Sequence, residues 1–127
     1  MKPQKTIYPN QEEIHELIIN KIKKDLLKET NEAYLIGSLA EGKFGFYDER
    51  YEGYFGSDID LVVISEKINP SWKYEGEFYG WHKKYFGGEI KIKKISHPIS
   101  LMVPFNTDIS LFWQKAKELN WKVEKLK

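Results

Sequence analysis

Two aspartates near the middle of the chain have the spacing most suited to chemistry. Asp58 and Asp60 lie at the start of an apolar run that ends at Ile64. On a β-strand, side chains at positions i and i+2 point to the same face, so the two carboxylates are expected to converge. Adjacent carboxylates repel each other unless a cation lies between them, and oxygen ligands favour Mg²⁺ or Mn²⁺. A metal ion held in this way commonly bridges substrate phosphates.

A glycine–serine pair earlier in the chain suits the phosphate side of that chemistry. Gly37 and Ser38 follow the apolar run 33–36. Glycine lets the backbone approach a phosphate closely, the serine offers a hydroxyl, and the following amides could open a helix whose N-terminus favours anions. The ordinary structural interpretation is a common turn at 37–38, with Asp58 ending a loop and Asp60 facing solvent. Together, at the ends of two buried strands, the four residues favour phosphoryl or nucleotidyl transfer.

These two segments resemble a family signature. Gly-Ser-x-Ala-x-Gly at 37–42, followed by Ser-Asp-Ile-Asp-Leu-Val-Val at 57–63, is similar to the motif of the polymerase-beta-type nucleotidyltransferases, particularly the minimal nucleotidyltransferases. The resemblance implies a nucleotidyltransferase-like mixed sheet flanked by helices. It also implies Mg²⁺-dependent transfer of a nucleoside monophosphate from an NTP, in the first place ATP, to an acceptor. Gly37 and Ser38 would then hold the triphosphate, and Asp58 and Asp60, as the catalytic residues, would hold two divalent metal ions.

The chain departs from the family pattern between these segments. The connection 39–57 is longer than the family's, so we expect an inserted aromatic arm between the first two strands. The arginines that usually follow the Gly-Ser pair are replaced by Leu39 and Glu41. Lys43 or Arg50 is the expected substitute for them, and Lys43 is our candidate for nucleotide binding.

The family's third carboxylate, on a later strand, has no counterpart at the matching position, which is Ser100. Glu89 is the best substitute and Asp108 the next. If neither reaches the acid pair, metal binding weakens. The alternative function is therefore a catalytically degenerate nucleotidyltransferase-fold protein that binds nucleotide or protein, and a purely structural module that uses its tyrosines is a third.

The resemblance also bears on partners. Small single-domain members of this branch commonly pair with a helical HEPN-type protein and nucleotidylate a protein hydroxyl. A partner of that kind is therefore expected beside the nucleotide. The alternative is a homodimer, since Trp113 and Trp121 fall off the apolar seam of the last predicted helix and would be partly exposed.

Helices and strands must position these residues, and the hydrophobic pattern predicts an α/β (α+β) fold in one domain, 1–127, with helices packed on a mixed sheet. The expected elements are a helix over 11–29 capped by Asn10, strands at 33–36 and 59–64, a helical turn and hairpin within 41–56, a helix over 70–86, strands at 89–95 and 98–103, and a last helix capped by Asn106 or Thr107. The helix over 70–86 rests on aromatic residues spaced by four, three and four positions, although Gly76 and Gly80 weaken it.

Composition excludes several other functions. The 127 residues contain no cysteine, which excludes a disulfide scaffold and a cysteine nucleophile. A net charge of +1 argues against generic nucleic-acid binding. The longest aliphatic stretch, 61–64, is far too short for a membrane span, and no signal peptide is apparent, so a cytoplasmic protein without membrane contact is expected. Residues 31–66 carry 2 basic and 8 acidic groups. We expect bound divalent metal ions to offset much of this negative charge, so that an anionic substrate can bind.

Overall fold

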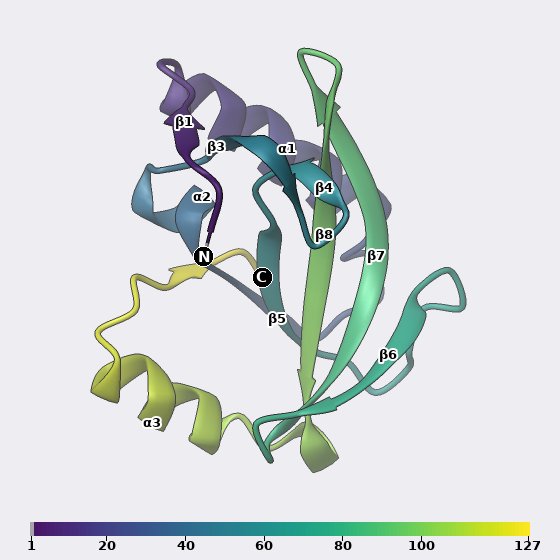
Figure 1. The fold of residues 1–127 in the computed structure, drawn as a ribbon. Helices are drawn as coiled ribbons and strands as arrows, with labels where there is room; N and C mark the ends of the chain where they lie inside the picture. The colour runs from purple at the N-terminus through teal and green to yellow at the C-terminus, as the bar shows by residue number, and fades with distance from the viewer. Residues whose placement is uncertain (1) are drawn as a thin grey trace.

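A computed structural model describes residues 2–127 and has an α+β fold built on two sheets (Figure 1). Its elements are β1 (Lys5–Ile7), α1 (Gln11–Asp25), β2 (Glu32–Ile36), α2 (Ser38–Glu41), β3 (Gly45–Tyr51), β4 (Tyr54–Gly56), β5 (Ile59–Ile64), β6 (Lys73–Phe78), β7 (His82–Ile92), β8 (Ile95–Pro104), the 3-10 turn η1 (Phe105–Thr107), α3 (Ser110–Glu118) and β9 (Glu124–Lys125). None of the helices in this part of the chain combines the length and the apolarity needed to cross a bilayer.

The larger sheet has six strands in the order β6-β7-β8-β5-β2-β9. The pair β5–β8 is parallel and the others are antiparallel, so the sheet is mixed, as the sequence predicts. β5 and β2 lie in its interior and consist almost entirely of buried residues. Their continuous apolar runs are typical of strands that are covered on both faces.

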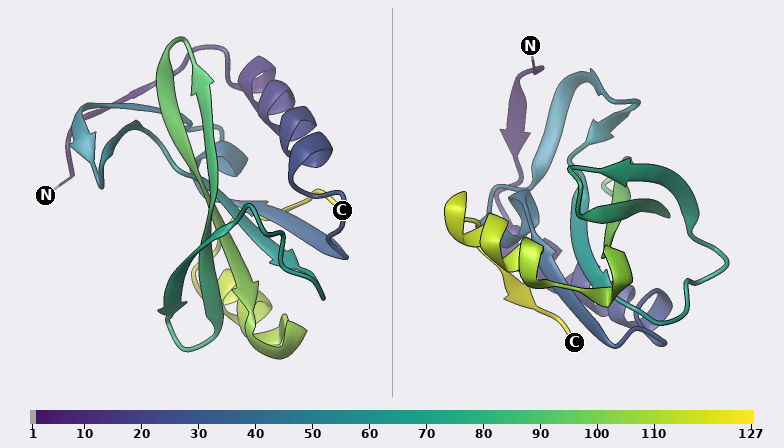
Figure 2. Two further views of the ribbon diagram at one scale, coloured as in Figure 1. Left: turned by 90° about the vertical axis from the view of Figure 1, so that its right-hand side faces the viewer. Right: turned by 90° about the horizontal axis from the view of Figure 1, so that it is seen from below.

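The two long helices cover opposite faces of this sheet (Figure 2). Along β5, Ile59 and Leu61 belong to the apolar core that contains α1, whereas Val62 belongs to the core that contains Phe112 of α3. This alternation follows from the two-residue period of a strand. Asp60 therefore points to the same face as Val62, towards α3 and away from α1.

A second sheet has three strands in the order β1-β3-β4. The segment between β2 and β5 forms the short helix α2 and then the hairpin β3–β4, and β1 pairs with the outer side of that hairpin. These three strands lie together at the top of Figure 1. In their register Lys5 lies opposite Tyr47, so the N-terminal segment is held beside the tyrosines of β3.

The prediction of a helix over 70–86 is wrong, because this segment forms the antiparallel hairpin β6–β7. Tyr79 and Gly80 at its tip both have positive φ angles, +55° and +75°, which a helix does not allow. Gly76, also at positive φ, lies at an irregularity of the β6–β7 register. The glycines that count against a helix were thus the more informative signal.

The C-terminal prediction is wrong in two respects. α3 begins at Ser110, and Asn106 and Thr107 belong to the preceding turn η1 instead of capping it. The helix ends at Glu118, and the apolar positions beyond it continue in an extended tail whose strand β9 pairs with β2. The free edge of β2 explains this outcome, since an exposed row of backbone N–H and C=O groups is satisfied by a further strand.

Candidate active site

The acid pair lies at the N-terminal end of the central strand β5. Asp58 precedes the strand and Asp60 is its second residue, and both side chains are half-buried. Burial, followed by the charge of Asp58, raises the pKa of Asp60 to about 7. Burial, followed by the charge of Glu52, raises the pKa of Asp58. Among the described side chains, none donates a hydrogen bond to either carboxylate or forms an ion pair with it, so the pair favours an added cation.

Gly37 lies directly against this pair. β2 runs antiparallel to β5 with Ile36 opposite Asp60, and the next residue turns away with a φ of +79°. A Cβ atom at position 37 would lie 2.6 Å from Oδ2 of Asp60, so a larger residue would displace that carboxylate and strain the backbone. From the sequence, Gly37 is expected to let the backbone approach a phosphate closely. In the structure, the group that its backbone approaches closely is the Asp60 carboxylate.

A polar cavity of about 310 Å³ opens in front of the pair. It is lined by Lys2, Lys5, Ser38, Glu41, Lys43, Tyr47, Tyr51, Ser57, Asp58 and Asp60. Together with the contact of Gly37 on Asp60, this means that all five residues predicted for nucleotide and metal binding, Gly37, Ser38, Lys43, Asp58 and Asp60, come together. Their chemistry combines two carboxylates, a hydroxyl and ammonium groups in one space.

Two lysines of this cavity were missed by sequence reasoning. Lys2 lies 5.7 Å from the ring centre of Tyr51, and Lys5 lies 6.0 Å from that of Tyr47, both within cation–π range. Burial, followed by the charge of Lys2, lowers the pKa of Lys5. A bound anion would relieve this crowding of positive charge. Part of the positive charge thus comes from the chain itself, in addition to any metal ion.

The proposed substitutes lie elsewhere. Glu89 pairs with Pro98 across the β7–β8 ladder and lines cavities other than those of the acid pair. Asp108 accepts hydrogen bonds from the backbone and hydroxyl of Ser110 at the start of α3, and Arg50 lies over the ring of Phe55. Among the described residues no group of three or more His, Cys, Asp or Glu is placed to hold a metal ion.

Ser100 is the residue that the sheet places beside Asp60. The parallel β5–β8 register pairs the two directly, so their side chains share a face. Ser100 and Asp58 also line a small cavity of about 80 Å³ together with Glu52, Glu75 and Lys84. The position at which the resemblance would place a third carboxylate is therefore adjacent to the pair in space, and it carries a hydroxyl.

A buried histidine fixes the segment before Asp58. His97 has no solvent exposure; its Nδ1 lies 2.9 Å from the carbonyl oxygen of Ser57 and its Nε2 lies 2.9 Å from the hydroxyl of Tyr8. Since a carbonyl only accepts, Nδ1 donates, and Nε2 accepts from the tyrosine hydroxyl. The Ser57 hydroxyl in turn bridges both backbone groups of Gly45. These bonds tie the acid pair to the hairpin sheet.

The arrangement has a definite chemical capacity. The unpartnered acid pair can hold a divalent cation, and the lysines and Ser38 around the same cavity can hold a polyanion. In comparisons with known proteins, no family model, no curated protein and no solved structure matches the chain.

Proposed function

We propose that this protein is an Mg²⁺-dependent nucleotidyltransferase that transfers a nucleoside monophosphate from an NTP, in the first place ATP, to a hydroxyl acceptor. The observation that carries the proposal is the unpartnered Asp58–Asp60 pair facing a cavity lined by three lysines. The cavity contains both carboxylates and ammonium groups, and each needs a group of opposite charge. A polyphosphate chelated to a divalent cation supplies both, because its phosphates complement the lysines and its metal ion complements the carboxylates.

Asp58 and Asp60 are the residues that would hold Mg²⁺ or Mn²⁺. They fit this role because their carboxylates have no partner among the described side chains, and because position 37 carries no Cβ atom, which would crowd Oδ2 of Asp60. When bound, the metal neutralises charge on the phosphates and polarises the phosphorus that is attacked. Two carboxylates from the chain are enough for this role, since Mg²⁺ in proteins is usually held by one or two carboxylates and keeps several water molecules.

The chain's own groups hold the rest of the nucleotide. Ser38 and Lys43 lie at the start and just after the end of α2, and with Lys5 they would bind the β- and γ-phosphates. The acceptor oxygen forms a bond to the α-phosphorus while the bond to the bridging oxygen breaks. Pyrophosphate leaves with that electron pair, and the acceptor proton passes to solvent.

The fold supports a place among the minimal nucleotidyltransferases. A Gly-Ser turn at the end of β2 next to an acid pair at the start of β5, within a mixed sheet, is the arrangement the resemblance implies. On this proposal the β3–β4 hairpin is the inserted aromatic arm. The acceptor would be a hydroxyl of a helical HEPN-type partner, or the protein would act as a homodimer.

One observation favours a second candidate, a degenerate nucleotidyltransferase fold that binds nucleotide without transfer. Ser100 stands where a third carboxylate would share the metal, and Glu89 does not lie at the acid pair. Such a protein would bind Mg²⁺ and NTP weakly and release no pyrophosphate.

The experiment incubates the protein with Mg²⁺ and ATP labelled at the α-phosphate, alone and with the product of the neighbouring gene. Label on either protein, together with pyrophosphate release and loss of both in Asp58→Asn, supports transfer. Binding of ATP by calorimetry without label transfer supports the degenerate alternative. Absence of both ATP binding and label transfer refutes the proposed function. Asp48→Asn, which removes an exposed carboxylate of β3, is the matched control.

A further inference from the structure

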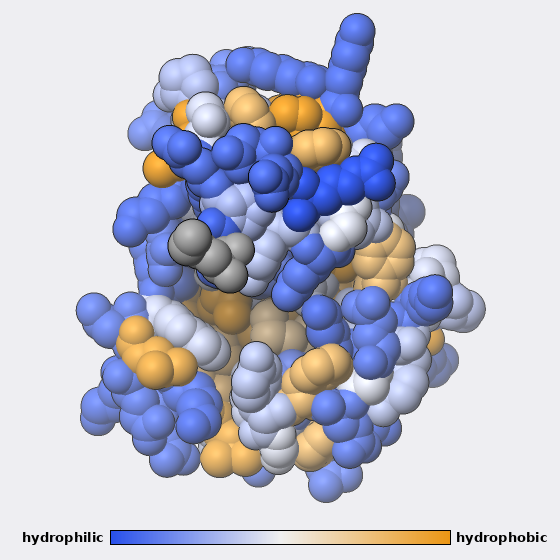
Figure 3. Space-filling view, in the orientation of Figure 1, coloured by the Kyte–Doolittle hydropathy of each residue, from blue (hydrophilic) through white to orange (hydrophobic). Residues whose placement is uncertain are grey.

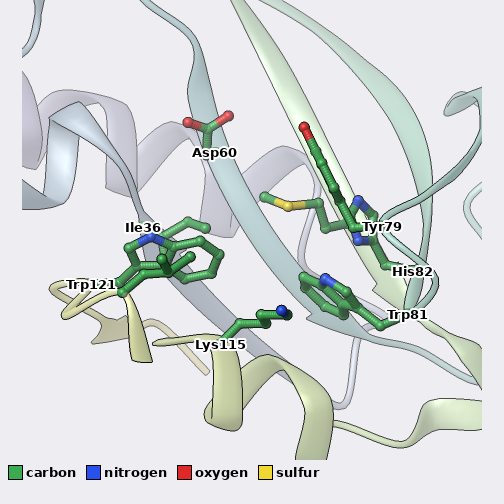
Figure 4. Close-up of a pocket in the computed structure, with 9 residues that line it drawn as sticks. Ile36, Asp60, Tyr79, Trp81, His82, Lys115 and Trp121 are labelled. Carbon is green, nitrogen blue, oxygen red and sulfur yellow. The ribbon is translucent and has the colours of Figure 1, made fainter. Parts of the chain in front are cut away.

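A second and larger cavity adjoins the acid pair on its other side. It measures about 560 Å³ and is lined by Ile36, Asp60, Tyr79, Trp81, His82, Met102, Lys115, Leu119 and Trp121. In the view of Figure 4, Asp60 lies at one end, Trp121 and Ile36 on one side, Tyr79 and His82 on the other, and Lys115 and Trp81 at the far end. Figure 3 shows this face of the molecule hollowed above α3, with hydrophobic residues at the bottom of the hollow.

The lining is aromatic and apolar, unlike that of the lysine-lined cavity. Two tryptophans and a tyrosine surround it, and Ile36 and Met102 form part of its floor on the sheet. Its volume lies in the range of small-molecule sites, which are mostly apolar with a few placed polar groups. Asp60 is the one residue that the two cavities share among those described.

His82, an almost completely buried histidine, is one of the polar residues that line this cavity. Its side chain is 2% exposed, and its Nδ1 has no hydrogen-bond partner among the described residues. Burial, followed by the charge of Lys84, lowers its pKa to about 4, so the imidazole is neutral at physiological pH. Because Nδ1 has almost no accessible surface, a ligand in the cavity would meet the imidazole through Nε2, which also has no hydrogen-bond partner among the described residues.

Tyr79 adds a second unusual feature. It is 85% exposed at the tip of the β6–β7 hairpin and has a φ of +55°, a backbone conformation that is rare for a bulky residue. Tyr79 and Gly80 are the central residues of a tight turn that the bond from the Trp81 N–H to the Phe78 carbonyl closes, and such a turn requires positive φ at both. The turn holds an aromatic ring at the mouth of the cavity.

We propose that this cavity binds the nucleobase of the NTP, stacked on Trp121 and Tyr79, with a polar edge of the base hydrogen-bonded to His82. This inference rests on the proposed function and names its missing subsite. In an NTP the α-phosphorus lies between the base and ribose on one side and the β- and γ-phosphates on the other. Asp60 lies between the two cavities in the same way, so one extended nucleotide fits both.

The lining selects a flat ring with a polar rim over an aliphatic ligand. Planar bases stack on aromatic side chains with little dependence on sequence. An aliphatic chain would fill the cavity but leave the His82 nitrogen without a partner. Lys115, at the end of the cavity far from Asp60 in Figure 4, adds a donor for a carbonyl or ring nitrogen of the base.

The experiment compares three probes on the full chain by calorimetry in Mg²⁺: ATP, inorganic tripolyphosphate and adenosine. Trp121→Ala is expected to weaken ATP binding by about five- to 150-fold, the range for loss of one stacked base. Tyr79→Asn is also expected to weaken ATP binding. Asparagine tolerates the positive φ at this position, so the substitution removes only an exposed ring. Tripolyphosphate binding stays unchanged in both. Tyr74→Asn, at an exposed tyrosine of the same hairpin outside the cavity, is the matched control.

The outcomes separate this inference from the proposed function. ATP affinity that is unchanged in both cavity variants overturns the nucleobase site, even if label transfer occurs and the proposed function stands. Adenosine binding that is lost in both variants supports the site, even if tripolyphosphate does not bind and the proposed function fails. A wild-type protein that binds neither ATP nor adenosine overturns both.

Discussion

Replacing Asp60 by asparagine is expected to stabilise the metal-free protein while it removes metal binding. The structure holds the Asp60 carboxyl group in a half-buried position beside Asp58 with no partner among the described side chains, and at pH 8 this group is ionised. Its pKa is raised from 3.8 to about 7, and each tenfold change in proton affinity corresponds to about 1.4 kcal/mol. At pH 8 the upper limit of the destabilisation is therefore about 4 kcal/mol. Because the side chain keeps part of its hydration, we expect about half of that, roughly 2 kcal/mol.

The assay is denaturant and thermal unfolding at pH 8 in EDTA, and then in Mg²⁺. Asp60→Asn should raise the melting temperature in EDTA by roughly 5–10 °C for a domain of this size. Added Mg²⁺ should stabilise the wild type, because a ligand that binds only the native state shifts unfolding, and it should have no effect on the variant. Asp48→Asn, an exposed control, should change little in either buffer. An Asp60→Asn variant no more stable than wild type in EDTA would refute this account of the acid pair.

Three further substitutions test neighbouring parts of the site. Gly37→Ala places a methyl group 2.6 Å from the Asp60 carboxylate at a φ of +79°, and it should cost about 1–3 kcal/mol in urea unfolding and lower Mg²⁺ affinity in calorimetry. Tyr8→Phe removes the hydroxyl that donates to His97, and it should cost about 1–3 kcal/mol of unfolding free energy, because a buried acceptor is left without a donor. Ser100→Asp adds a third carboxylate beside Asp60, and it should lower stability in EDTA but tighten Mg²⁺ binding in calorimetry; unchanged Mg²⁺ affinity would contradict the register argument.

The acid pair and the Gly-Ser turn could be found from the sequence because each adjoins a long apolar run. Buried strands such as β2 and β5 leave that signal without help from the rest of the chain, and their antiparallel pairing then brings Gly37 to Asp60. The candidate site residues and their order along the chain could therefore be identified from the sequence. The particular contact between glycine and carboxylate was not, because it depends on which residue of β5 lies opposite the end of β2.

The lysines of the N-terminal segment left no such signal. β1 has three residues and no apolar face, and it exists because the edge of β3 offers backbone groups to pair with. The tip of the β6–β7 hairpin was hidden for a different reason. Aromatic residues spaced by three and four positions fit a helix as well as two strands, and tertiary pairing with β8 decided between them. As a result the aromatic cavity beside Asp60 could not be foreseen, since two of its walls come from segments assigned to helices.

Asp60 and His82 line the same cavity and should oppose each other in the pH dependence of stability. The pKa of Asp60 is raised, so the folded chain binds the proton more tightly, and stability increases as the pH falls from about 7 towards 4. The pKa of His82 is lowered from 6.5 to about 4, so the folded chain binds that proton less tightly, and stability decreases over nearly the same interval. The upper limits of the two contributions, about 4 and about 3 kcal/mol, are similar, so these two contributions should largely cancel in the metal-free wild type between about pH 4 and pH 7.

Single variants should reveal the two hidden slopes. In urea unfolding with EDTA, Asp60→Asn should lose stability relative to the wild type as the pH falls below 6.5, since the contribution of Asp60 no longer opposes that of His82. His82→Gln should gain stability relative to the wild type over the same range, since the contribution of His82 no longer opposes that of Asp60. Parallel pH profiles for the wild type and both variants would show that neither group changes its proton affinity on folding. Opposite slopes would show that the cavity keeps both the Asp60 carboxyl group and the His82 imidazole uncharged at mildly acidic pH. An uncharged lining favours a neutral aromatic ring over an ion.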